Sequence, residues 1–265
     1  MTTLLWILGA SLLGGVVSMV AAAWVAFRAR PAAIPILVSY SVGALLAAAF
    51  LGVLPHAMES APAPSVLGAS VLAGLLVFFL LEKLVLWHHH HGPQWGEEKH
   101  HAEIAQGHHG HSIDAHGKSG ILIVVGGMIH NFVDGTLIAA AFLADFRLGI
   151  LTALAIMAHE VPSEVGNFLV LLHSGYTRRA ALLLNLMTRV AMVLGGLIGY
   201  LALQSLQGWI PSLLGFVAAS MIYVAVADLI PGLHRRVDLA ATIQQVLLIG
   251  LGIATIALVQ AFIGH

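Results

Sequence analysis

The sequence predicts an all-α integral membrane protein with eight transmembrane helices. Of the 265 residues, 59% are hydrophobic and only 9% are charged, and the mean hydropathy is +0.96. A soluble domain carries a much larger charged share, about 25%. The apolar residues form eight long stretches, each able to supply the roughly 20 residues that a helix needs to cross a bilayer. Such continuous stretches argue against a barrel, whose strands are about ten residues long and alternate in polarity.

We expect one transmembrane domain, residues 1–265, with helices at approximately 3–27, 34–56, 65–86, 119–143, 148–173, 180–203, 208–230 and 240–263. The first helix lacks the basic flank of a cleaved signal peptide, so we expect it to remain. Helices one and six carry small residues that are typical of close helix packing. These are Gly14, Gly15 and Ser18 in helix one, and Gly195, Gly196 and Gly199 in helix six.

The basic residues predict the orientation of the helices. Nine of them follow odd-numbered helices: Arg28, Arg30, Lys83, Lys99, Lys118, Arg178, Arg179, Arg235 and Arg236. Only Arg147 follows an even-numbered helix. The positive-inside rule therefore predicts that both termini lie outside the cytosol. Arg189 is the exception, because it falls within helix six and needs a partner or water there.

One long connection separates helices three and four, the segment 88–117. It is polar and without periodicity, which predicts a disordered cytosolic loop. Ten of the sixteen histidines lie in it: His88, His89, His90, His91, His100, His101, His108, His109, His111 and His116. Imidazole tracts bind transition metals with little geometric preference, so we interpret the loop as a transient metal acceptor or sensor. A neutral linker is the alternative.

This loop also suggests a 3+2+3 arrangement of the helices. Three helices precede it, and three at the C-terminal end would match them, with helices four and five in the middle. Because three is odd, a duplicated three-helix unit would be inverted, as in many transporters with a site near the midplane. The end of helix two, Leu54-Pro55-His56, resembles the end of helix seven, Ile230-Pro231, and supports this repeat.

Two polar runs interrupt the apolar stretches, HNFVDG at 130–135 and HEVPSE at 159–164. Helical spacing places His130 and Asp134 on one face, with Asn131 on the same turn. In the second run, His159 and Ser163 share a face, and Glu160 and Glu164 share the neighbouring face. Pro162 cannot donate its N–H, so it should kink helix five and free a carbonyl near these residues.

Three carboxylates at membrane depth would cost on the order of 8 to 10 kcal/mol if ionised and unpaired. Arg189 is the one basic residue at similar depth, so protons or bound cations must compensate most of this cost. Imidazole and carboxylate together suit zinc, iron and manganese, held as one ion or as two. For a single buried polar residue a hydrogen bond between helices would explain as much, but six ligand types in two runs favour metal binding.

Other polar residues are weaker candidates. Glu59 lies at the outer end of helix two, where a solvated end residue is the simpler interpretation. Asn185 and Thr188 on helix six, and Asp228 on helix seven, could extend the site or form hydrogen bonds between helices. There is no cysteine, which excludes thiolate ligands and disulfides.

The two motifs, the eight spans and the His-rich loop together resemble the ZIP family of divalent metal transporters. The most similar branch usually reads HNFxDG and HExPHExGD. The resemblance covers essentially the whole chain and implies inverted three-helix repeats around helices four and five. It also implies a two-ion centre with the ligands His130, Asn131, Asp134, His159 and Glu160, with Glu164 a further participant and Asn185 a peripheral one.

The chain departs from that branch at four positions. Ser163 stands where the branch often has a second histidine, and Asn167 replaces a usual aspartate. In helix two, Ala48 and Gly52 stand where the branch often has Asp and His. These changes remove nitrogen donors and negative charge, so metal preference is open.

We therefore expect uptake of a divalent cation, zinc first, with iron, manganese, cadmium and cobalt as further candidates. The motif helices would expose the site to each side in turn, and transport should depend on pH because the ligands must lose protons. Two alternatives remain, a metal sensor that does not transport and an intramembrane zinc hydrolase, although Ser163 breaks the HExxH signature of the latter. The expected location is a bacterial inner membrane; the partners are metal ion and lipid, a homodimer is left open, and no nucleic acid is expected.

Overall fold

The computed structural model confirms the all-helical membrane fold. It describes residues 2–28, 33–89, 113–234, 236 and 238–263, and every regular element in them is helical. Eight of these helical segments are long and apolar enough to cross a membrane, at Thr2–Val25, Ile34–Ser60, Pro64–Lys83, Val124–Ala144, Phe146–Leu172, Arg178–Gln204, Gln207–Leu233 and Leu239–Ile263. Each of the eight predicted spans coincides with one of them.

Six of the spans each lie within a single α-helix. The helices are α1 (Thr2–Arg28), α4 (Pro64–His89), α5 (Ile113–Ala144), α6 (Phe146–His173), α7 (Arg178–Gln204) and α10 (Leu239–Ile263). Capping side chains set two of the starts, because Asp145 accepts from the backbone N–H of Leu148 and Thr177 accepts from that of Ala180.

Spans two and seven are each interrupted by a π-helix. Span two runs through α2 (Ala33–Ala47), η1 (Ala48–Val53) and α3 (Leu54–Ser60). Span seven runs through η2 (Gln207–Trp209), α8 (Ile210–Tyr223), η3 (Val224–Leu229) and α9 (Ile230–Leu233). In both spans the π-helix is followed by an α-helix with proline at its second position, where a missing N–H costs nothing.

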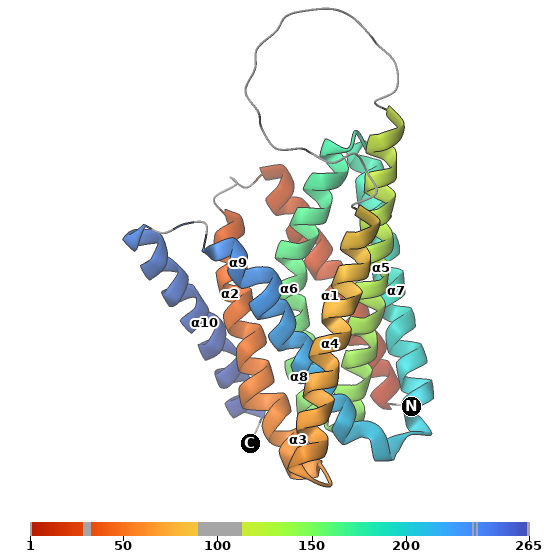
Figure 1. Ribbon diagram of the computed structural model, residues 1–265, viewed down its shortest axis with the longest axis vertical. Coiled ribbons are helices and arrows are strands. Elements are labelled where there is room, and N and C mark those ends of the chain that lie inside the picture. Colours follow the sequence, from red (N-terminus) through yellow and green to blue (C-terminus); the bar gives the residue numbers. More distant parts are fainter. Residues whose placement is uncertain (1, 29–32, 90–112, 235, 237, 264–265) are drawn as a thin grey trace, which may run out of the picture.

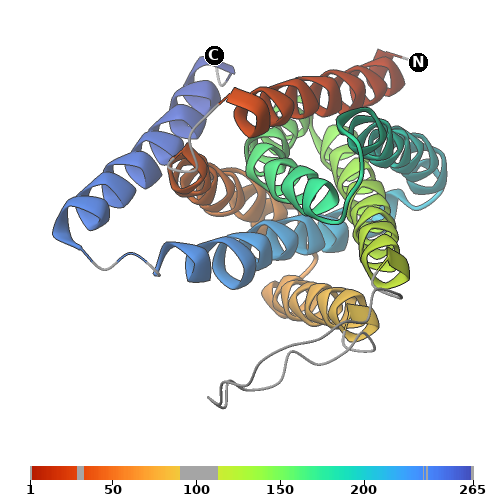
Figure 2. The same ribbon diagram turned by 90° about the horizontal axis from the view of Figure 1, so that it is seen from above.

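The motif helix α6 lies at the centre of the bundle. Seen from above, α1, α2, α5 and α7 surround it, whereas α4 packs on α8 and α10 packs on α2 at the periphery (Figure 2). The start of α1 and the end of α10 lie at one end of the bundle, and the end of α4 and the start of α5 lie at the other (Figure 1). The arrangement therefore buries the two polar runs and leaves the apolar faces of the outer helices toward lipid.

The predicted loop is shorter than 88–117. Its first two residues continue α4 to His89, and its last five form the start of α5 from Ile113. The rest of it, 90–112, lies outside the described residues.

The glycines of the predicted helix six lie on α7, where α7 packs against α5 with the two backbones in contact. This is the close packing that the small residues predicted. A Cβ on Gly195 would overlap the backbone of Phe132, and one on Gly199 would lie 3.1 Å from the Cα of Thr136. On the α5 side, a Cβ on Gly135 would overlap the backbone of Met192. This close approach fixes the position of the HNFVDG run of α5 against α7.

Replacing Gly195 by Ala should therefore destabilise the protein. The added methyl group must push α5 and α7 apart, and overpacking of this kind costs about 1 to 3 kcal/mol. Thermal unfolding in detergent measures the effect. Gly9→Ala is the matched control, because a Cβ there meets nothing within 4 Å. An unchanged melting temperature for Gly195→Ala would contradict the close packing.

Candidate metal centre

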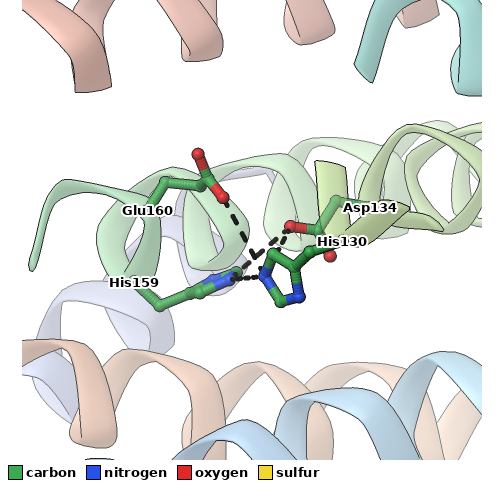
Figure 3. A group of neighbouring side chains, drawn as sticks. All are labelled: His130, Asp134, His159 and Glu160. Atoms are coloured by element: carbon green, nitrogen blue, oxygen red, sulfur yellow. Dashed lines mark hydrogen bonds and ion pairs between the residues drawn. The ribbon is translucent and has the colours of Figure 1, made fainter. Parts of the chain in front are cut away.

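Four side chains from α5 and α6 converge inside the bundle, His130 and Asp134 from α5 and His159 and Glu160 from α6 (Figure 3). Each offers one ligand atom, and all four atoms lie within 4.8 Å of one another. The i, i+4 spacing brings the two α5 residues to one face, and the crossing of α5 over α6 brings the two pairs together. All four belong to the seven residues that the sequence analysis gave as candidate ligands.

Three of the distances suit ligands of a single tetrahedral ion. His130 Nε2 lies 3.3 Å from His159 Nε2 and 3.4 Å from Asp134 Oδ2, and His159 Nε2 lies 3.6 Å from the same oxygen. Zinc bonds of about 2.0 to 2.2 Å in tetrahedral geometry require ligand atoms about 3.3 to 3.6 Å apart. Glu160 Oε1, at 4.0 Å from His130 Nε2, completes the set from slightly farther away.

Burial distinguishes the two imidazoles. The His159 side chain is only 4% exposed, whereas that of His130 is 34% exposed. His130 and Asn131 line a cavity of about 350 Å³, together with Ser163 and Asn167. His130 is thus the ligand through which an ion would meet the cavity.

Asn131 and Asp134 each keep an unused acceptor. The Asn131 amide donates to Gly127 O at 2.8 Å, but its Oδ1 is buried without a hydrogen-bond partner among the described residues. Asp134 Oδ2 is likewise buried and forms no hydrogen bond of good geometry there. Buried oxygen atoms of this kind are costly unless they bind something, which favours a cation site.

Arg189 reaches the same region from α7 and forms ion pairs with Glu160 and Glu164. All three side chains are buried. The sequence predicted that Arg189 needs a partner but not that it binds two of the three candidate acids. Glu160 uses Oε2 for Arg189 and turns Oε1 toward His130, whereas Glu164 is outside the four-residue group.

Asn185 lies one turn before Arg189 on α7 and is also buried. Its backbone carbonyl accepts a hydrogen bond from Thr188 at 2.7 Å. The ligand roles of Asn131, Glu164 and Asn185 stay predictions, as does the second ion.

Pro162 lies inside α6, which runs without interruption from Phe146 to His173. The carbonyl that a proline frees is the one four residues earlier, here that of Ala158. Ser41 Oγ on α2 donates to this carbonyl at 2.5 Å. The freed carbonyl thus links α6 to α2.

The cavity has a second acidic part, of which the sequence analysis named Asp228 but not Glu82. Glu82 on α4 accepts a hydrogen bond from the Tyr223 hydroxyl on α8, and both line the cavity with Asp228. Glu82 is an acidic residue inside the third predicted span, which is the feature that could have marked it. Because Lys83 follows it directly, the pair resembles the charged end of a helix. Asp228, considered only as an extension of the site, lies on this same wall.

Comparison with known proteins decides the family. The family model described as ZIP zinc transporter matches residues 1–260. The chain belongs to the ZIP family. It is 32% identical over 248 residues to the zinc transporter ZIP13 of Pongo abelii, a match that covers 86% of this chain and 67% of that protein. It is 30% identical over 265 residues to the zinc transporter ZIP13 of Homo sapiens, a match that covers 86% of this chain and 71% of that protein.

A more distant relative is the zinc transporter YKE4 of Saccharomyces cerevisiae, 28% identical over 220 residues, with 74% of this chain and 60% of that protein covered. Membership confirms the predicted family and makes this chain a multi-pass protein of metal transport. ZIP proteins are transporters and not enzymes, so the hydrolase alternative is set aside.

Loss of a central ligand should weaken metal binding. We expect His159→Ala to lower the affinity for Co²⁺ by more than about tenfold, because one of four ligands is lost. Visible absorption of the bound Co²⁺ in detergent measures it. His234→Ala, at an exposed helix end, is the matched control. Equal affinity and an unchanged spectrum in both variants would contradict the proposed ligand set.

Proposed function

We propose that this ZIP protein carries divalent transition-metal ions, zinc first, into the cytosol by alternating access. The observation that carries the proposal is the convergence of two imidazoles and two carboxylates on adjacent membrane-spanning helices. The relatives are named zinc transporters, and the ligand distances suit zinc. Iron, manganese, cadmium and cobalt remain further candidates, because imidazole and carboxylate ligands also suit these metals.

The cavity supports a route to the site. His130, Ser163 and Asn167 line it together with the acids Glu82 and Asp228. Carboxylates along such a route attract cations, and the weak donors Ser163 and Asn167 hold them loosely. An ion can then exchange between the tight group and water without a second strong site in between.

The two π-helices support the inverted repeats of the 3+2+3 arrangement. η1 in span two packs against α8 of span seven, and η3 in span seven packs against α2 of span two. This reciprocal contact is what two copies of one unit, related by a two-fold axis in the membrane plane, would form. π-Helical segments often occur at functional sites, and these two flank the motif helices as candidate hinges.

Asp134→Asn should lower the rate of zinc uptake into liposomes at least about tenfold, because a neutral amide is a much weaker ligand. A zinc-sensitive dye inside the liposomes measures the flux. Asp145→Asn is the control, since it removes a charge but keeps a good N-cap for α6. Zinc binding without flux in the wild type would favour the metal sensor, the alternative that remains.

Both termini are proposed to face away from the cytosol. The distribution of basic residues supports this orientation, and so does the position of both termini at the same end of the bundle (Figure 1). The cysteine-free chain allows a direct test. In intact cells, a membrane-impermeant thiol reagent should label Gln207→Cys at the start of span seven, but not His234→Cys just after its end. Both positions are exposed. The reverse pattern would overturn the orientation.

The membrane that holds the protein stays a prediction. The named relatives are eukaryotic, so they lend no support to a bacterial inner membrane. A homodimer likewise stays a prediction.

A further inference from the structure

The charge of the centre is set by four ionisable groups besides the histidines. Asp134, Glu160 and Glu164 are acidic, Arg189 is basic, and all four are buried. With neutral imidazoles the formal charge is minus two. One divalent cation neutralises this charge, whereas a second would leave two uncompensated positive charges in a medium of low dielectric constant.

We propose that the Arg189 guanidinium is a built-in cation that takes the place of a second metal ion and restricts the centre to one. The proposal deepens the proposed function, since the ion that it counts is the substrate. It departs from the two-ion centre that the family resemblance implied. Arg189 is a specificity-determining residue here and does not contact the ion.

The geometry divides the carboxylates between metal and arginine. Glu160 bridges the two, with Oε1 toward His130 and Oε2 on Arg189. Glu164 gives Oε1 to the other guanidinium nitrogen of Arg189. A second ion beside Glu160 would need the oxygens that Arg189 now binds. Each of these two ion pairs is a charge-assisted hydrogen bond, and together they tie the guanidinium to two different carboxylates.

The fold also makes room for this arginine. A Cβ on Gly15 of α1 would lie 2.9 Å from Arg189 Cδ, so the stem of the side chain fills the space that this glycine leaves. Gly15 on α1 thus leaves the space that the Arg189 side chain occupies beside α6. An arginine placed by ion pairs and by a matching glycine is part of the centre.

Ion counting in the purified full chain tests the proposal. In every variant the histidines between His88 and His116 are replaced by serine, so that differences report on the centre. Zinc per chain is measured by elemental analysis after dialysis against a fixed concentration of free zinc. We expect Arg189→Gln to bind one ion more than the reference protein and Arg189→Lys to bind the same number. The first ion should also bind at least about tenfold more tightly to Arg189→Gln, because a repelling charge is gone.

Glu164→Gln gives a second test that does not depend on Arg189→Gln folding. Under the proposal it leaves the number of ions unchanged, whereas a two-ion centre that uses Glu164 would lose one. An unchanged count in folded Arg189→Gln, or a lost ion in Glu164→Gln, would overturn the proposal. Counting the bound ions does not require transport. A protein that binds one ion as described but moves no zinc in liposomes would therefore contradict the proposed function and leave the role of Arg189 intact.

Discussion

The requirement that buried charges be balanced governs the centre of this protein. Two glutamates of α6 and one arginine of α7 are buried together, and each carboxylate forms an ion pair with the guanidinium. Taking such groups out of water costs several kcal/mol per ion, and close pairs with good geometry are what repay it. The pairs cover only part of the negative charge. The remainder lies beside the imidazoles, where the proposed cation would balance it.

The packing of the helices follows from where these groups must lie. α6 carries its acids into the middle of the bundle, so neighbouring helices have to approach closely on every side. Glycines permit this approach, at Gly195 and Gly135 between α7 and α5 and at Gly15 beside Arg189. Ser41 meets the carbonyl that Pro162 frees. Small residues and hydroxyls therefore allow close contacts between these helices beside the apolar core.

Transport requires that the ion be held and then released, and the site has features for both. His159 is buried within the bundle, whereas His130 borders the cavity. The lining of this cavity also includes the hydroxyl of Ser163 and the amide of Asn167, together with the acids Glu82 and Asp228. In the proposed function, these weaker donors beside the four-residue group would let an ion leave it.

The sequence by itself determined the number and limits of the spans, because hydrophobic length has a fixed relation to bilayer thickness. It also predicted the four-residue cluster, since helical spacing places His130 with Asp134 and sets the faces of His159 and Glu160. Only the tertiary structure decided which acids pair with Arg189. The partner of Arg189 depends on how α7 crosses α6, and Glu82 joins the cavity because α4 packs on α8. Contacts between helices depend on packing angles that periodicity within one helix does not contain.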